Sequence, residues 1–207
     1  MPTPLTQRLA STLVTNGGSD EGDVNSEAEI SIVPYDCSWP ARFVAEHEAL
    51  SRAIGDYLSG TIEHIGSTAV PGLAAKPVID IMAGVVSLVA SRPAISILDG
   101  LDYCYFPYRP DEMHWFCKPS PQSRTHHLHL VPFGSRIWNE RIAFRDYLRE
   151  HSAAAADYAR LKEQLAEQYR FDRESYTDAK APFVRRIVEQ ALADTKDDRT
   201  SVDTGSV

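Results

Sequence analysis

An apolar stretch that contains one carboxylate constrains this chain more than any other feature. Residues 76–84 read KPVIDIMAG, with Asp80 as the acidic residue among apolar neighbours. Strand side chains alternate between two faces, so Asp80 shares a face with Val78 and Met82, opposite two isoleucines. A buried carboxylate is costly unless it is paired or bound to a cation. The stretch therefore predicts a buried strand in which Asp80 either forms a structural ion pair with an Arg or Lys or binds a metal.

A glycine-serine turn comes directly before this strand. Residues 63–80 read EHIGSTAVPGLAAKPVID, in which a short strand leads into Gly66 and Ser67. Glycine lets the backbone approach a ligand closely, while Ser67 and Thr68 offer the hydroxyl and N–H groups that an anion site needs. Lys76 closes the loop with a positive charge. The segment predicts a phosphate cradle, with an ordinary turn as the alternative, and it lacks the GxxxxGK[ST] pattern of a P-loop.

Three histidines fall in one later strand. Residues 124–132 read RTHHLHLVP, so His127 and His129 share a face, while His126 faces the other way with two leucines. Two imidazoles at alternate positions can converge on one metal or one phosphate. Arg124, just before the strand, is either a bidentate ligand for phosphate or carboxylate or a solvated turn residue.

The remaining periodicity predicts strands first and helices last. We expect strands at 30–34, 61–65, 77–85, 101–105, 114–118 and 125–132, and helices beginning near Ser38 and at 91–98. Residues 137–193 read as mostly helical, with breaks near His151 and at 171–175. This order favours an α+β fold in which helices pack on one side of a mixed sheet.

One face of the expected late helix carries a basic stripe. Arg141, Arg145 and Arg149 recur four residues apart. Such a stripe is typical of a solvated surface, and the alternative is a wall for the phosphates of a nucleotide.

Composition sets the boundaries and excludes some classes of protein. Residues 1–28 and 194–207 are poor in large apolar groups, so we expect disordered tails around a domain at 29–193. The 207 residues carry a net charge of −8, which excludes a globally basic nucleic-acid coat. The chain has no apolar run of about 18 residues and no signal-like start, so no membrane span and a cytoplasmic location are expected. Three widely spaced cysteines are expected to be buried and reduced.

Five segments together resemble the GrpB family: IVPYDCSWPARF, IEHIGSTAVPGLAAKPVIDI, THHLHLV, AFRDYLREH and YTDAKAPFV, over roughly residues 30–193. The resemblance implies a nucleotidyltransferase-like fold: a mixed β-sheet packed by helices, in which a Gly-Ser loop precedes a strand with metal-binding carboxylates. Gly66 and Ser67 match that Gly-Ser, and Asp80 matches the first carboxylate. Met82 stands where the second carboxylate falls, so the resemblance implies one metal or an altered ligand set.

The leading functional prediction is metal-dependent transfer of a nucleotidyl group from a nucleoside triphosphate to a small-molecule acceptor. The triphosphate is assigned to Gly66, Ser67, Thr68 and Lys76. A divalent cation (Mg, Mn or Zn) is assigned to Asp80, His127 and His129, where imidazole ligands favour Mn or Zn. The predicted catalytic residues are Asp80, Ser67 and Arg124.

Two other functions fit the same residues. The loss of the second carboxylate is compatible with a non-catalytic module that binds a nucleotide or a CoA-like ligand. The scaffold is also compatible with different transfer chemistry, such as hydrolysis or ligation of a phosphorylated metabolite. The sequence predicts a small-molecule substrate and no nucleic-acid partner, and it leaves the acceptor, the base and the oligomeric state open.

Overall fold

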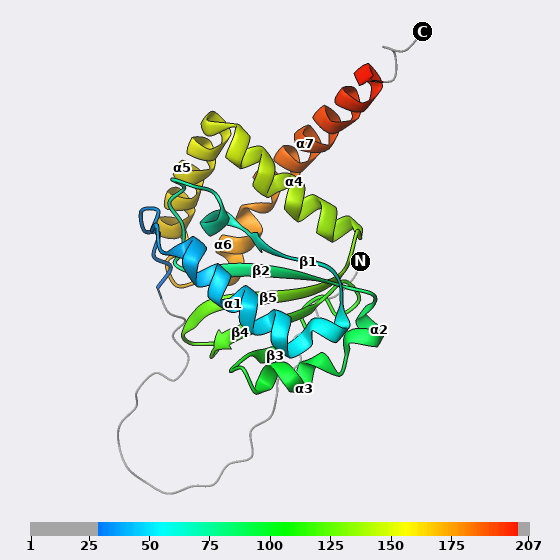
Figure 1. Ribbon diagram of the computed structural model, residues 1–207. Coiled ribbons are helices and arrows are strands. Elements are labelled where there is room, and N and C mark those ends of the chain that lie inside the picture. Colours follow the sequence, from blue (N-terminus) through cyan, green and yellow to red (C-terminus); the bar gives the residue numbers. More distant parts are fainter. Residues whose placement is uncertain (1–28, 203–207) are drawn as a thin grey trace, which may run out of the picture.

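A five-stranded mixed sheet forms the centre of the part of the chain that the computed structural model describes: the backbone of residues 29–202 and the side chains of residues 29–194 (Figure 1). The strands are β1 (Leu58–Ile65), β2 (Ile79–Val85), β3 (Cys104–Phe106), β4 (His114–Pro119) and β5 (Arg124–Pro132). Their order is β1-β2-β5-β4-β3, and β2 pairs with β5 in parallel while the other pairs are antiparallel. The mixed sheet predicted from the sequence is confirmed.

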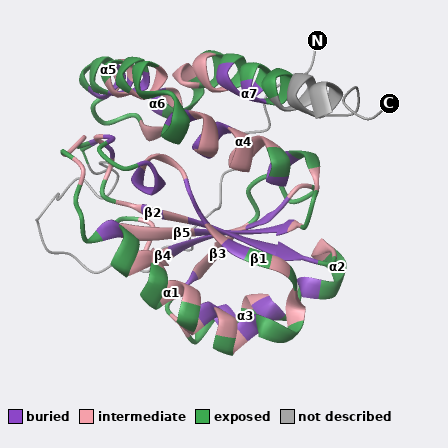
Figure 2. Cartoon of the chain, turned by 45° about the horizontal axis from the view of Figure 1, so that its top comes forward, coloured by how far each residue is buried: buried purple, intermediate pink, exposed green. Residues whose placement is uncertain are grey.

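Helices cover both faces of this sheet. They are α1 (Trp39–Ile54), α2 (Leu88–Ser91), α3 (Ala94–Asp99), α4 (Arg136–Glu150), α5 (Ser152–Gln168), α6 (Arg173–Ala179) and α7 (Ala181–Val202), with short 3-10 turns at Gly55–Tyr57 and Ser67–Ala69. Figure 2 shows α1 and α3 on one side of the sheet and α4 to α7 on the other. The prediction that helices pack on one side was wrong, because apolar residues occupy both faces of β2 and each face needs cover.

The two faces of β2 belong to different apolar clusters. Ile79 and Ile81 pack with Trp39 and Leu50 of α1 in the main core. Met82, on the opposite face, is fully buried in a cluster completed by residues of β1, β5 and α4, namely Ile65, Val131, Ile137 and Trp138. The predicted alternation along this strand is therefore confirmed.

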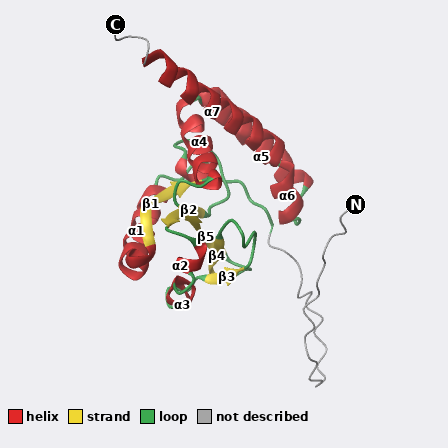
Figure 3. Ribbon diagram, turned by 90° about the vertical axis from the view of Figure 1, so that its right-hand side faces the viewer, coloured by secondary structure: helices red, strands yellow, loops and turns green. Residues whose placement is uncertain are grey.

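The C-terminal helices form a layer beyond α4. Figure 3 shows α4 next to the sheet and α5 and α7 on its outer side. Phe144 and Leu148 of α4 pack there against Tyr158 of α5 and Ile187 of α7. The helical C-terminal part predicted from the sequence is thus anchored to the sheet through α4.

Several local predictions differ from the structure. The segment 30–34 forms only an isolated bridge between Val33 and Ala75, because its partner is a loop and not a sheet strand. The helix expected at 91–98 is two helices separated at Pro93, and the first begins earlier, capped by Ser87. The strand expected at 101–105 forms later in the chain, as β3 (Cys104–Phe106).

Helix boundaries also differ in detail. The α1 helix begins after Ser38, but the Ser38 side chain makes no capping bond, and its N–H instead donates to Asp36. The break at His151 is confirmed, and a further break occurs at Lys180. Helix α7 continues past 193 to Val202. The tail predicted at 1–28 lies outside the described residues.

The three cysteines are free thiols, as expected. Cys117 is buried, but Cys37 is exposed and Cys104 is half-buried, so the prediction of burial was correct for one of the three. Cys37 lies in the loop before α1, where no element covers it.

Candidate functional site

Asp80 and His127 meet at the centre of the sheet. Their Cα atoms are partners in the register between the parallel strands β2 and β5, so both side chains leave the same face. The Nδ1 atom of His127 lies 2.9 Å from Oδ1 of Asp80. Residues from two separate predicted motifs therefore form one hydrogen-bonded pair.

The Asp80 carboxyl is ionised. Burial alone would raise its pKa, but the hydrogen bond and charge of His127 outweigh burial and hold the pKa well below its usual range. An ionised carboxylate accepts hydrogen bonds only, so His127 donates its Nδ1 hydrogen to Asp80. About 30% of the Asp80 side chain is nevertheless open to solvent, so the carboxylate is accessible and not in a sealed core; the accessible surface around it is termed the Asp80 recess.

Gly66 touches this carboxylate. Its φ of +71° lies in the region that favours glycine, and a Cβ atom there would fall 2.5 Å from Oδ2 of Asp80. The turn before β2 thus requires glycine both for its backbone conformation and for the space that Asp80 occupies. The sequence predicted that the backbone at Gly66 approaches a ligand closely; in the structure it approaches the carboxylate of Asp80.

The hydroxyl groups of the turn are engaged within the chain. Ser67 forms a hydrogen bond with the buried phenol of Tyr158 on α5. Thr68 is buried; its Oγ1 donates to the carbonyl of Val78 and lies 3.0 Å from Nε2 of His64. Of the two hydroxyls that the sequence assigned to a phosphate cradle, Thr68 is therefore turned away from Asp80.

Two lysines share one aromatic ring beside the site. The Nζ atoms of Lys76 and Lys180 lie 4.8 and 4.1 Å from the ring centroid of Tyr176. Burial, together with the charge of Lys76, lowers the pKa of Lys180 to about 7, while Asp80 acts in the opposite direction. The sequence assigned Lys76 but missed Lys180, which lies in the segment YTDAKAPFV, one of those that carry the resemblance to GrpB.

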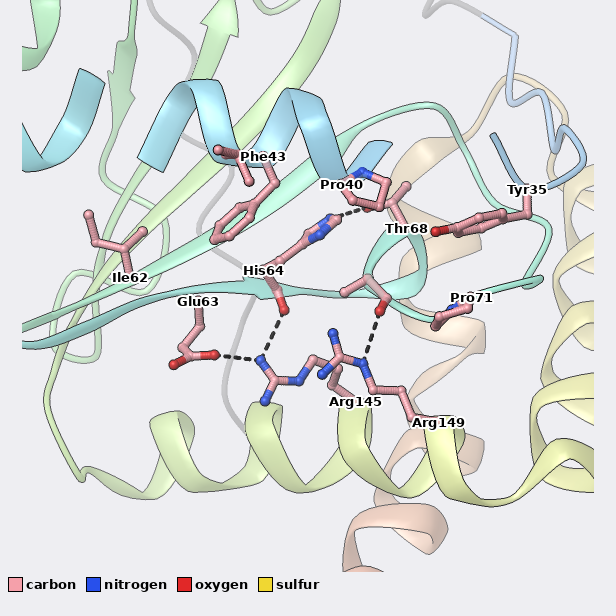
Figure 4. Close-up of a pocket in the computed structure, with 12 residues that line it drawn as sticks. Tyr35, Pro40, Phe43, Ile62, Glu63, His64, Thr68, Pro71, Arg145 and Arg149 are labelled. Atoms are coloured by element: carbon pink, nitrogen blue, oxygen red, sulfur yellow. Dashed lines mark hydrogen bonds and ion pairs between the residues drawn. The ribbon is translucent and has the colours of Figure 1, made fainter. Parts of the chain in front are cut away.

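Two members of the arginine stripe are structural. Nη1 of Arg145 lies 2.6 Å from a Glu63 carboxylate oxygen and donates to the carbonyl of His64, and Nε of Arg149 donates to the carbonyl of Ala69 (Figure 4). These bonds tie α4 to β1 and to the turn that follows it. Arg145 is buried, so the prediction of a solvated stripe was wrong for it, whereas Arg149 is exposed.

Arg141 differs from the other two arginines. It lies one helical turn from the buried residues Ile137 and Arg145, and so on the face of α4 that packs on the sheet. It makes no hydrogen bond or ion pair with any residue in 29–194. Burial lowers the pKa of Arg141, whereas the charge of Asp80 raises it. Arg141 is therefore a half-buried guanidinium close enough to Asp80 to feel its charge.

The remaining predicted residues surround the pair more loosely. His129 is buried on the same face, and its Nδ1 contacts Sδ of Met113 at 3.4 Å. The Arg124 guanidinium lies 5.5 Å from the Trp115 ring centroid, and its Nε donates to a turn carbonyl. The same Trp115 ring lies 5.1 Å from the His127 ring, centroid to centroid. Arg124 is thus connected to His127 through an aromatic ring and not by direct contact.

The three residues assigned to a metal do not fit as a joint ligand set. Oδ1 of Asp80 already accepts from His127, and Nδ1 of His129 faces a methionine sulfur. Within the described ranges, no group of three or more His, Cys, Asp or Glu is placed to hold a metal ion. One nitrogen stays available, since the buried Nε2 of His127 has no partner among the residues described.

A cavity lies at the edge of β1. Its volume is about 330 Å³, and it opens between α1 and α4 (Figure 4). Thr68 lines it, but none of the other predicted site residues does. Its two arginines, Arg145 and Arg149, are already bonded within the chain. The cavity is thus separate from the Asp80 recess.

The fold and the site define a class: an α+β protein whose mixed sheet carries an Asp–His pair on two parallel strands, behind a glycine turn. The model of the family described as "GrpB protein" matches residues 29–190. The chain belongs to the GrpB family, as the sequence motifs indicated.

Relatives of known sequence and structure agree with this assignment. A UPF0157 protein of Pseudomonas aeruginosa is 40% identical over 172 residues, covering 81% of this chain and 69% of its own length. A UPF0157 protein of Deinococcus radiodurans is 37% identical, over 85% of this chain and 90% of its own. The crystal structure of the conserved protein GrpB from Enterococcus faecalis superposes with a TM-score of 0.73 at 32% identity, over 80% of this chain and 99% of its own.

No helix within the described residues combines the length and the apolar character that crossing a bilayer requires.

Proposed function

We propose that this protein transfers a nucleotidyl group from a nucleoside triphosphate to a small-molecule acceptor in the cytoplasm. The observation that carries the proposal is the ionised Asp80 carboxylate, held by His127 and set against the Gly66 turn in a recess that basic side chains surround. Basic groups offset the charge of a triphosphate, and they also stabilise the charge that develops as it reacts. A small molecule, and not a nucleic acid, is the proposed partner.

Each residue has a specific part in this reaction. The nucleophilic atom of the acceptor attacks the α-phosphorus, the bond to the pyrophosphate oxygen breaks, and the nucleophile loses its proton. Asp80 orients the His127 imidazole through Nδ1, so that in the neutral form of the ring Nε2 is the atom able to take that proton. Lys76 offsets charge on the leaving pyrophosphate, and Arg124 is assigned to the same oxyanion.

Substitution of Asp80 tests the proposal. The protein is incubated with a panel of nucleoside triphosphates and a metabolite extract, in the presence of Mg²⁺, Mn²⁺ or Zn²⁺ or with a chelator, and new masses are recorded. Asp80→Ala should abolish turnover in every mixture, while Asp99→Ala, at an exposed position on α3, should leave it intact. Turnover that survives Asp80→Ala would overturn the assignment.

One observation favours a second function, a non-catalytic module that binds a nucleotide or a CoA-like ligand. Met82 occupies the position of a second carboxylate and is fully buried among apolar residues, so no acidic group can act there. Thermal shift with nucleotides separates the two functions. Stabilisation by a nucleotide with no product in any mixture would identify the module.

A further inference from the structure

The predicted phosphate cradle leaves an anion short of hydroxyl donors. Ser67 is bonded to Tyr158, and Thr68 is bonded to His64 and to the carbonyl of Val78. A phosphate beside Asp80 would also face the negative charge of that carboxylate. Binding a phosphate chain here therefore needs positive side chains from elsewhere in the fold.

The helical half of the protein supplies one such group from α4. Arg141 lies on the sheet-facing side of the helix, between buried Ile137 and buried Arg145. Arg145 satisfies its charge with Glu63 and Asp146. Arg141 makes no such bond with any residue in the described part of the chain, and its half-buried side chain is left accessible. This arrangement is typical of a group kept for a ligand.

The junction between α6 and α7 supplies the second group. Lys180 and Lys76 lie over the same Tyr176 ring, so their ammonium groups are no farther apart than the sum of their distances to its centroid, 4.1 and 4.8 Å. The charge of Asp80 acts on Lys76, Lys180 and Arg141. Arg141 from α4 and Lys180 from the α6–α7 junction thus lie, with Lys76, within the field of one carboxylate.

We propose that Arg141 of α4 and Lys180 at the α6–α7 junction, with Lys76, bind the phosphate chain of a polyphosphate ligand over Asp80. The ligand class is a linear di- or triphosphate, either inorganic or attached to a nucleoside. The expectation that the chain is attached to a nucleoside rests on the proposed function, whereas the expectation that the site binds a phosphate chain does not. The C-terminal helices thus form one wall of the binding site as well as a support for the sheet.

Inorganic tripolyphosphate is the probe, since it cannot donate a nucleotidyl group. Binding to the full chain is measured by calorimetry, with the four common nucleoside triphosphates as parallel arms. Arg141→Gln and Lys180→Gln should each weaken tripolyphosphate binding at least tenfold. The matched control is Arg136→Gln, an exposed arginine on the same helix that pairs with Glu112 and Glu140 and should bind as the wild type does.

The melting temperature of the free protein shows whether Arg141 binds a ligand or stabilises the fold. Arg141→Gln should leave the melting temperature of the free protein nearly unchanged, because the half-buried guanidinium makes no hydrogen bond or ion pair with residues 29–194. The shift that tripolyphosphate produces should fall in the same variant. If Arg141→Gln does not fold, Lys180→Gln on a different element gives the binding readout.

The outcomes distinguish this site from the proposed chemistry. Wild-type protein that shows no saturable binding of tripolyphosphate would overturn the inference, and so would unchanged binding in both variants. Binding that both variants weaken, in a protein that forms no product from any triphosphate, supports the site and contradicts nucleotidyl transfer. Tighter binding of the nucleoside triphosphates than of tripolyphosphate identifies the nucleotide as the source of the phosphate chain.

Discussion

His127 donates a hydrogen bond to Asp80 over 2.9 Å, although the two residues are 47 positions apart in the sequence. The bond fixes the imidazole tautomer, because the hydrogen on Nδ1 faces an ionised carboxylate. In the neutral form of the ring the lone pair is then on Nε2, which has no partner among the described residues. The pair therefore presents a nitrogen that can accept a proton or a hydrogen bond from a ligand.

Gly66 is expected to be intolerant of any side chain. Gly66→Ala should lower the free energy of unfolding by about 3 kcal/mol, from backbone strain and from displacement of Asp80. Gly72→Ala is the matched control: its φ is +78°, but a Cβ atom there meets nothing within 4 Å. It should cost only about 1 kcal/mol, the strain of the backbone. Chemical denaturation measures both values, and equal losses in the two variants would contradict the close approach at Gly66.

Met82 is expected to tolerate an apolar residue but not a carboxylate. Met82→Asp places a charge in the cluster of Ile65, Val131 and Trp138 and should cost about 4 kcal/mol. The control Met82→Leu conserves volume and polarity and should cost less than about 1.5 kcal/mol. Urea denaturation compares the two variants. A stable Met82→Asp protein would show that this position reaches the recess and could bind a cation.

His64 is expected to weaken the fold in acid. Burial lowers its pKa from an ordinary 6.5 to about 4. The unfolded chain therefore binds more protons than the folded chain between these values, so the free energy of unfolding falls as the pH is lowered from about 6.5 to about 4. His64→Gln removes this contribution. Denaturation across that range should give a shallower slope for the variant, and parallel curves would refute the assignment.

Lys162 is expected to act at the other end of the pH scale. Its side chain is 2% exposed, and its Nζ donates to the carbonyl of Ala74. Burial, with a smaller contribution from the charge of Lys180, lowers its pKa from 10.5 to about 7. The unfolded lysine keeps its proton over that interval, so the free energy of unfolding should rise with pH from about 7 to about 10.5.

The variant Lys162→Met isolates this contribution. Both proteins keep Lys180, so the difference between their stability curves reports Lys162 together with its electrostatic coupling to Lys180. The difference should change steadily between pH 7 and pH 10. A constant difference over that range would show that Lys162 stays protonated in the folded protein.

The strands that carry the site could be predicted because their patterns are local. Period-two alternation placed Asp80 and Met82 on one face of β2, and His127 and His129 on one face of β5, as the structure shows. The segment 30–34 failed for the same reason, since its apolar character is local but its pairing depends on a loop far along the chain.

The positions of Arg141 and Lys180 beside Asp80 could not be predicted from such patterns. Arg141, Arg145 and Arg149 are equivalent by spacing, yet the structure pairs two of them and leaves Arg141 facing the recess. The three arginines differ in the segment that faces each one: Arg145 bonds to β1, and Arg149 bonds to the turn after β1. Lys180 lies 100 positions beyond Asp80, so no spacing rule connects the two residues.

The sequence by itself determined the two strands that carry the site, the glycine turn at Gly66, the lone carboxylate of Asp80 and membership of the GrpB family, because each depends on neighbours in the chain. The tertiary structure alone decided that Asp80 bonds to His127, that the Thr68 hydroxyl contacts His64, and that Arg141 and Lys180 lie near Asp80. These relationships depend on register between strands and on how helices pack over a sheet. Both are set by the burial of apolar faces against each other. A local pattern shows that a segment has an apolar face, but not which distant segment covers it.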